Sequence, residues 1–271
     1  MTEELRAAAH NDMRLADAAG EWGQLAELEV GVDSSRTGRA RARRRLFLTD
    51  RDVRLLGWIG EQYCVRGDLL AVLMARHSDD EAARAAGRVT DAAVRRRVGA
   101  WRAAGLVATE QFLAKTPATV WLTAEGMATC GLGWRASAPT FATVAHRHAV
   151  GVVRVWVEGR GRDYQWICER ELRDGLDQPA GGRRDHLADG VVVSTGQDGR
   201  VGRSAIEVEL TRKTKGRVEE ILRGLLARYD DVIYFAVPTA AGTVRTAAES
   251  VRAADRVRVR PYPPETLATV A

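Results

Sequence analysis

The sequence has no long apolar run, only three cysteines and almost no lysine. It contains no stretch of about 18 apolar residues, so we expect no membrane-spanning helix. Residues 1–20 lack a basic start followed by an apolar core, which argues against a secretory signal. Cys64, Cys130 and Cys168 are far apart and form no CxxC pair. Their spacing argues against a disulfide framework and a zinc site, and it predicts a reducing, cytoplasmic location.

Arginine supplies most of the positive charge in a chain with a formal net charge of +5. The stretch RTGRARARRR carries six arginines and no acid, and it ends with Arg43, Arg44 and Arg45. Such a run is typical of a solvated linker, and beside a DNA-binding fold it is also typical of a phosphate-contacting arm. Both interpretations stay open. We expect residues 1–45 to form a helical segment followed by this linker.

A length of 271 residues is enough for two domains. We expect residues 46–135 to form the first of them. Helical patterns, two short alternating segments and a polar turn around Lys115 follow one another along this region. The helices are expected over 50–64, 67–74 and 90–105, and the strands over 106–112 and 119–126. Thr49 or Asp50 is expected to cap the first helix, and Thr90 or Asp91 the third. Gly105 has the position of a C-terminal cap.

Three helices followed by a two-stranded ribbon resemble a winged helix-turn-helix domain. The resemblance implies that the third helix enters the major groove of DNA and that the ribbon reaches the neighbouring backbone. The candidate DNA contacts are Arg95, Arg96, Arg97, Arg102 and Lys115. Arginine can bind phosphates or read guanine edges. Two other interpretations remain: these arginines solvate a core helix, or the domain binds another protein.

Residues 136–271 are expected to form a second, α/β domain. A helix reaching about Glu158 is followed by three strands, an amphipathic helix and a further buried strand, the order αβββαβ. A last short strand is expected at VRVRPY.

Acidic side chains collect around the second and third of these strands. In SAIEVEL, Glu207 and Glu209 share one strand face, and Asp189 directly precedes the strand before it. An antiparallel hairpin would bring Asp189 near both glutamates. Close carboxylates repel each other unless a cation lies between them or one of them is protonated. A hard divalent cation is the usual solution, which predicts Mg²⁺ or Mn²⁺ at Asp189, Glu207 and Glu209. Lys213 is the candidate for stabilising negative charge on a phosphodiester.

This constellation resembles the PD-(D/E)XK nuclease-like superfamily. The resemblance assigns Asp189 and Glu207 to the two motif acids, and Glu169, with Glu171 second, to the glutamate of the leading helix. Ala188 replaces the motif proline, and Glu209 occupies the motif lysine position, so that Lys213 would supply the lysine.

The whole arrangement is similar to the replication-relaxation family of actinobacterial plasmids and integrated elements. The residues that carry this similarity are E-R-E-L, the His186-x-x-Asp189-Gly190 element, and I-E-V-E-L-T-x-K. Membership would imply a role in plasmid replication and DNA relaxation. The partners it implies are double-stranded DNA and replication or mobilisation proteins. The resemblance to winged-helix and nuclease-fold proteins, which often act as dimers, adds a second copy of the chain.

Several alternatives stay open. Taken alone, Glu207 and Glu209 are typical of a solvated strand face. His186 could bind phosphate, orient an acid, or be a loop residue without a role. His146 and His148 are two residues apart on a helix, which favours packing over metal binding. The domain could also be a non-catalytic accessory factor or regulator. A covalent tyrosine mechanism has no clear candidate, because Tyr229 lies on an apolar helix face.

Overall fold

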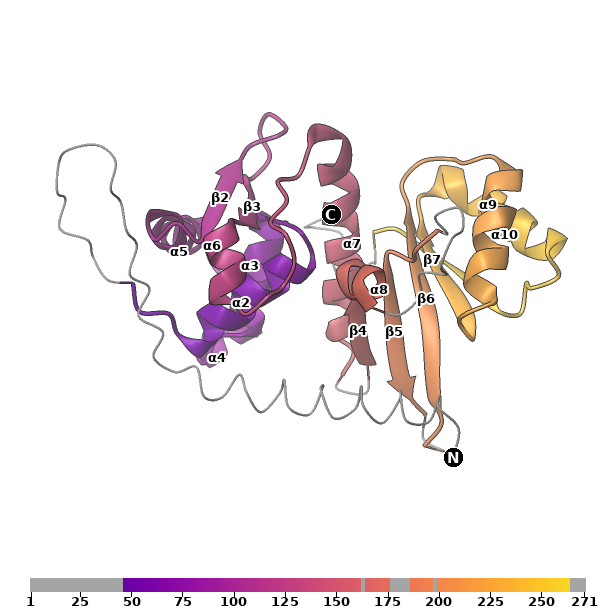
Figure 1. Ribbon diagram of the computed structural model, residues 1–271, viewed down its shortest axis with the longest axis horizontal. Coiled ribbons are helices and arrows are strands. Elements are labelled where there is room, and N and C mark those ends of the chain that lie inside the picture. Colours follow the sequence, from indigo (N-terminus) through magenta and orange to yellow (C-terminus); the bar gives the residue numbers. More distant parts are fainter. Residues whose placement is uncertain (1–45, 162–163, 176–185, 197–198, 264–271) are drawn as a thin grey trace.

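The computed structural model describes residues 46–161, 164–175, 186–196 and 199–263. Over these residues the chain is a mixed α/β protein with two β-sheets (Figure 1). The expected mixture of helices and strands is therefore confirmed. The expectations for residues 1–45, including Arg43, Arg44 and Arg45, lie outside the described residues. No helix in the described ranges is long and apolar enough to cross a membrane.

The N-terminal part combines helices with a small sheet of strand order β1-β3-β2. Its elements are α2 (Asp50–Glu61), β1 (Val65–Arg66), α3 (Gly67–Arg76), α4 (Glu81–Ala85), α5 (Asp91–Ala103), β2 (Val107–Glu110), β3 (Thr119–Leu122) and α6 (Ala124–Thr129). The three expected helices and both expected strands form. The second strand is shorter than expected, because it ends at Leu122 and Thr123 then caps helix α6, which the sequence did not predict. The short strand β1 was not expected, and it pairs antiparallel with β3.

Helix α4 was also not predicted from the sequence. Asp80 caps it by accepting a hydrogen bond from the N–H of Ala82 at 2.9 Å, and none of the residues of α4 is buried. A helix without an apolar face leaves no 3.6-residue period to detect. The capping aspartate was therefore its main sequence signal.

Threonine side chains cap both α2 and α5. Thr49 Oγ1 accepts from the N–H of Asp52 at 3.2 Å, and Asp52 Oδ2 accepts from the N–H of Thr49 at 2.9 Å, which completes a capping box. Thr90 Oγ1 accepts from the N–H of Ala93 at 3.2 Å. After α5 the chain turns at Gly105, whose φ of 79° is the left-handed conformation expected of a glycine cap.

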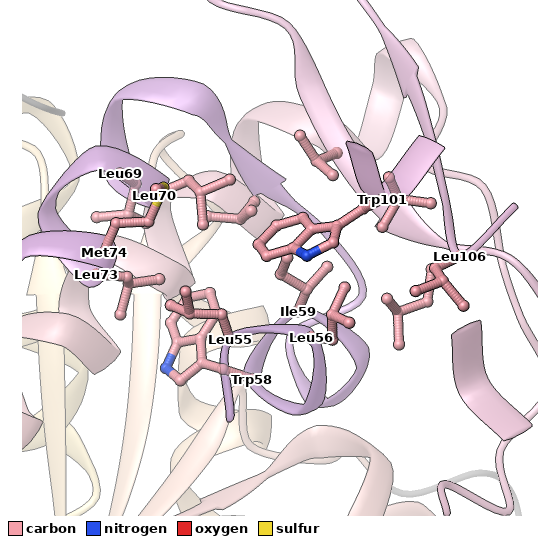
Figure 2. Packing of buried hydrophobic residues seen from close by; sticks show 14 of the residues in the cluster. Leu55, Leu56, Trp58, Ile59, Leu69, Leu70, Leu73, Met74, Trp101 and Leu106 are labelled. Atoms are coloured by element: carbon pink, nitrogen blue, oxygen red, sulfur yellow. The ribbon is translucent and has the colours of Figure 1, made fainter. Parts of the chain in front are cut away.

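The apolar faces of α2, α3 and α5 form the core of the N-terminal part (Figure 2). Trp101 of α5 is fully buried, and its Nε1 donates to Oδ1 of Asp52 on α2 at 3.2 Å. A buried indole N–H requires an acceptor, so this bond fixes the position of α5 against α2. Arg97 Nε lies 3.3 Å from the same Oδ1.

Helix α7 (Phe141–Glu158) lies between the two sheets (Figure 1). Val152 packs into the N-terminal core, whereas Val153 packs against the larger sheet. Because α7 has apolar residues on two sides, one side packs on the N-terminal core and the other on the larger sheet. The expected domain boundary at 135/136 precedes α7, yet α7 contributes to the cores of both parts.

A buried ion-pair network joins α7 to α2. The Arg154 side chain is 7% exposed, and its Nη2 lies 2.5 Å from Glu61 Oε2 while its Nε lies 2.6 Å from Glu158 Oε1. Trp58 Nε1 donates to the other carboxylate oxygen of Glu158 at 3.1 Å. The network pairs two nitrogens of the buried guanidinium with carboxylates, while Nη1 has no hydrogen-bond partner among the described residues. It ties the N-terminal part to the central helix.

The C-terminal part is built on a five-stranded sheet of order β4-β5-β6-β7-β8. Its elements are β4 (Tyr164–Cys168), α8 (Glu169–Gly175), β5 (Gly190–Thr195), β6 (Val201–Glu209), α9 (Lys215–Leu226), β7 (Asp231–Ala236), α10 (Pro238–Ser250) and β8 (Val257–Pro261). Strand β5 is antiparallel to both of its neighbours, and β6, β7 and β8 are parallel. Helix α7 covers one face of the sheet, and α9 and α10 cover the other (Figure 1).

Helix α10 is the largest element that the sequence did not predict. Its buried residues are three alanines and one valine, Val244, so its apolar stripe is weak. Pro238 at its first position was the available start signal.

Candidate functional site

Asp189 lies beside Glu207 because β5 and β6 form the expected antiparallel hairpin. Gly190 pairs with Ile206, and the N–H of Asp189 donates to the carbonyl oxygen of Ile206 at 3.1 Å. Asp189 Oδ2 accepts from the N–H of Val208 at 2.8 Å. The backbone of β6 therefore fixes the carboxylate of Asp189 next to that of Glu207.

Glu207 and Glu209 lie on the central strand of the sheet. Strand β6 has β5 on one side and β7 on the other, and the two residues are 2% and 3% exposed. The interpretation as a solvated strand face is therefore wrong. Ala205, two residues earlier, packs in the core under α9 and α10, so the two glutamates project toward the same side of the sheet.

Burial, followed by the negative charge of Asp189, raises the pKa of Glu207 from its ordinary value to about 7. The hydrogen bond and the positive charge of His186 oppose the shift, as does the charge of Lys213. A buried carboxylate next to another carboxylate favours a proton or a cation. Glu207 can therefore exchange a proton near neutral pH.

Each of the two acids is paired with a histidine. His146 Nε2 on α7 lies 2.8 Å from Asp189 Oδ1, and His186 Nε2 lies 2.9 Å from Glu207 Oε1. The hydrogen bond to Asp189 raises the pKa of His146. Burial alone would lower the pKa of His186, but the hydrogen bond and charge of Glu207 outweigh it and raise the pKa. His186 thus orients an acid, one of its two expected roles.

Sequence reasoning missed His146, which it assigned to packing. The helical spacing of His146 and His148 indicated only that the two side chains point to different sides of α7. His148 is buried, whereas His146 reaches Asp189, 43 residues further along the chain. No sequence signal links the two positions, because only the packing of α7 on the sheet brings them together.

Lys213 forms an ion pair with Glu209, four residues before it. The Lys213 side chain is 35% exposed, whereas the Glu209 side chain is almost fully buried. The expected clustering of Lys213 with the acids is therefore present, and the positive charge of Lys213 also acts on both histidines and on Glu207.

Glu169 and Glu171 have different surroundings at the start of α8. Glu171 Oε2 accepts from the N–H of Cys168 at 2.8 Å, which caps the helix. Glu169 forms an ion pair with Arg173 and lines a small cavity of about 20 Å³ together with His146 and Asp189. Of the two glutamates, Glu169 therefore lies at the candidate site. The expectation that it belongs to the leading helix is wrong, because that helix is α7, and Glu169 begins α8 after strand β4.

Tyr234 is a further residue of the site that the sequence did not single out. It lies opposite Glu207 in the β6–β7 ladder and is 1% exposed. Burial, followed by the charges of Glu207, Glu209 and Asp189, raises its pKa. Within the described part of the chain, the phenol oxygen has no hydrogen-bond partner. The sequence showed only that Tyr234 lies within VIYFAVP, and this pattern predicted a buried strand and no role in the site.

The donor set of the site is compatible with a hard divalent cation. The carboxylates of Asp189 and Glu207 lie together, burial raises the pKa of Glu207, and carboxylate oxygens are the ligands that Mg²⁺ prefers. Among the described residues, no three His, Cys, Asp or Glu side chains are already grouped as metal ligands. The side chains instead form two histidine–carboxylate pairs, which a cation would have to rearrange.

The candidate DNA-contacting residues divide into two groups. Arg95, Arg96 and Arg102 are exposed on α5, and Lys115, with a φ of 62°, is exposed in the turn between β2 and β3. Arg97 differs because it pairs with the buried Asp52, and its side chain is only 26% exposed. Its main contact is thus within the fold, and the exposed basic face of α5 consists of the other three arginines.

Comparison with family models, with curated proteins and with solved structures finds no match for this chain. The chemistry of the site therefore has to be argued from its own geometry. A hairpin-bound carboxylate pair, two histidines able to exchange protons and a half-exposed lysine can bind a cation, activate water and stabilise an anion.

Proposed function

We propose that the protein binds double-stranded DNA and hydrolyses a phosphodiester bond in it with Mg²⁺ or Mn²⁺, in the replication or relaxation of a plasmid or mobile element. The observation that carries the proposal is the pairing of Asp189 with buried Glu207, whose pKa is raised to about 7, beside Lys213. Buried acids with perturbed pKa values collect at functional sites, since apolar residues would serve stability better.

The order of elements supports this proposal. Helix α7, strands β4, β5 and β6, helix α9 and strand β7 follow the αβββαβ order implied by the resemblance to PD-(D/E)XK nucleases, except that the short helix α8 stands between β4 and β5. In the N-terminal part, the three expected helices α2, α3 and α5, with the short helix α4 between the last two, precede a hairpin whose strand β3 pairs with β1, an order that supports a winged helix-turn-helix domain. The exposed arginines of α5 would then face the major groove.

The residues of the site take distinct roles in this proposal. Asp189 and Glu207 would hold the ion, which supplies a water of lowered pKa and stabilises charge on the phosphodiester. His186 and His146 hold the two carboxylates in place and can carry protons. Lys213 offers its exposed ammonium group to the negative charge that develops on the phosphate. Glu209 keeps Lys213 at the site through their ion pair.

The proposal is tested by incubating the full chain with supercoiled and linear plasmid in Mg²⁺, Mn²⁺ or EDTA. Wild type should nick or cut DNA only with metal, and Asp189→Asn and Glu207→Gln should lose that activity. Glu249→Gln, which makes the same chemical change on an exposed residue of α10 outside both proposed DNA-contacting surfaces, should cut normally. Cutting that persists in both site variants would point to a contaminating nuclease and overturn the assignment.

A second candidate function is a non-catalytic DNA-binding replication accessory factor or transcription regulator. The specific observation in its favour is that Glu209 occupies the motif lysine position and holds Lys213 in an ion pair. In this case the protein would bind DNA in a salt-sensitive way, and neither wild type nor the site variants would cut it. The same plasmid experiment, followed by a gel-shift measurement, separates the two functions.

We also propose a cytoplasmic location. Cys64, Cys130 and Cys168 all lie among the described residues, and each is a buried, unpaired thiol. Burial raises the pKa of Cys64 and of Cys130 to about 12, which keeps both as unreactive thiols. Measuring the thiol content of the protein purified without reductant would test this location.

A further inference from the structure

A basic groove adjoins the carboxylate site on the side of the sheet covered by α9 and α10. It has a volume of about 700 Å³ and lies where these two helices begin. Its lining includes Arg212, Lys213 and Lys215 and the hydroxyl groups of several threonines, and no acidic residue lines it. Lys213 belongs both to this groove and to the ion pair with Glu209, so the groove continues directly from the carboxylates.

The topology of the sheet explains why this groove is electropositive. Strands β6 and β7 are parallel, and each is followed by a helix, so α9 and α10 both start at the same edge of the sheet. The N-termini of helices carry partial positive charge and unpaired N–H groups. Helix α10 starts after Val237, which provides no side-chain cap, so its first N–H groups receive no hydrogen bond from a capping side chain.

The charges of the groove are only partly neutralised. Lys215 Nζ lies 3.2 Å from Glu219, which is outside the lining, and Lys213 is paired with Glu209. Arg212 is exposed, and in the described part of the chain it forms no ion pair. The groove is also open, because a Cβ atom added at Gly242 would meet no atom within 4 Å.

We propose that this groove binds backbone phosphates of the DNA strand whose neighbouring phosphodiester lies at Asp189 and Glu207. This inference rests on the proposed function and specifies the path of the substrate across the surface. Arg212 and Lys215 would contact phosphates and carry no base specificity, since phosphate contacts fix the position of the strand but do not read its sequence. Lys213 would connect this track to the reacting phosphate.

The test uses Arg212→Ala/Lys215→Ala in the full chain. Arg223→Ala/Arg245→Ala is the matched control, because it removes the same charge from exposed positions of α9 and α10 that do not line the groove. Binding of a fluorescein-labelled DNA duplex is followed by anisotropy over a range of salt concentrations, in EDTA so that no cleavage occurs. Thermal unfolding confirms that both variants are folded.

The expected result is that DNA binding by the groove variant depends less steeply on salt concentration than binding by wild type. Each phosphate contact contributes about 0.9 to the slope of log K against log salt concentration, so losing two contacts should reduce the slope by about 1 to 2. The control variant should retain the wild-type slope. The affinity of the groove variant should fall by the same factor for duplexes of unrelated sequence.

Three outcomes would overturn the inference, and they are distinguishable. If wild type binds DNA and the groove variant keeps its slope, the groove is not the phosphate track, and the proposed function stands. If both double variants lose slope equally, the effect is one of net charge alone. If wild type binds no DNA at all, the proposed function fails and the groove assignment fails with it.

Discussion

Replacing Glu207 by glutamine should stabilise the metal-free protein at pH 8 while it abolishes DNA cleavage. Glutamine has nearly the same shape, and its amide oxygen can accept the hydrogen bond that His186 gives to Glu207 Oε1. The substitution removes only the buried negative charge, which burial and the neighbouring Asp189 make unfavourable. The site is thus expected to retain Glu207 for function at a cost in stability.

The size of the effect follows from linkage. The pKa of Glu207 rises from the ordinary value of 4.5 to about 7 on folding. Because the folded state binds the proton more tightly, stability is lost as the pH rises through this interval, and the full loss is present above pH 7. At about 1.4 kcal/mol for each pKa unit, the ionised carboxylate costs about 3 kcal/mol at pH 8 and about 1 kcal/mol or less at pH 5.

Urea denaturation in EDTA at pH 5 and pH 8 measures this difference. Glu207→Gln should be more stable than wild type by about 3 kcal/mol at pH 8, and the gain should shrink toward pH 5. The exposed-site control Glu249→Gln should show no comparable pH dependence. A Glu207→Gln protein that is equally or less stable than wild type at pH 8 would refute the argument that this carboxylate is electrostatically strained.

Three further predictions concern the packing around the site. Tyr234→Phe removes a buried hydroxyl without a partner and should stabilise the protein by about 1 kcal/mol, measured by urea denaturation; a loss of stability would show that the hydroxyl is satisfied. Arg154→Met leaves two glutamates without their partner and should cost about 3 kcal/mol by the same assay, whereas a neutral result would contradict the structural role of the network. Gly190→Ala would place a Cβ atom 2.1 Å from the Trp166 ring, so it should lower the free energy of unfolding by about 3 kcal/mol and lower the thermal midpoint with it. The control Gly202→Ala, on the neighbouring strand, should change the free energy of unfolding by less than about 1 kcal/mol.

Much of the secondary structure could be predicted from the sequence because its signals are local. Apolar residues at helical spacing, with Thr49 and Thr90 as caps and Gly105 as a stop, determined α2 and α5. Elements with weak apolar patterns were missed. Helix α4 has no buried residue, and α10 buries mainly alanine.

Contacts in the candidate site could be predicted only between residues that are close in the sequence or joined by a hairpin. Hairpin pairing brings Asp189 to Glu207, and four-residue spacing brings Lys213 to Glu209, so both pairs could be inferred from the sequence. His146 could not be assigned, because its contact depends on how α7 packs on the sheet.

By itself, the sequence determined which acids are grouped and in what order the helices and strands follow one another. The tertiary structure decided their environment. It placed β6 at the centre of the sheet, which buries Glu207 and raises its pKa, and it turned Arg97 of α5 toward Asp52. The physical reason is that the hydrophobic period and the helix caps are set by a few neighbouring residues. The burial of a side chain and its electrostatic environment depend on every element packed around it.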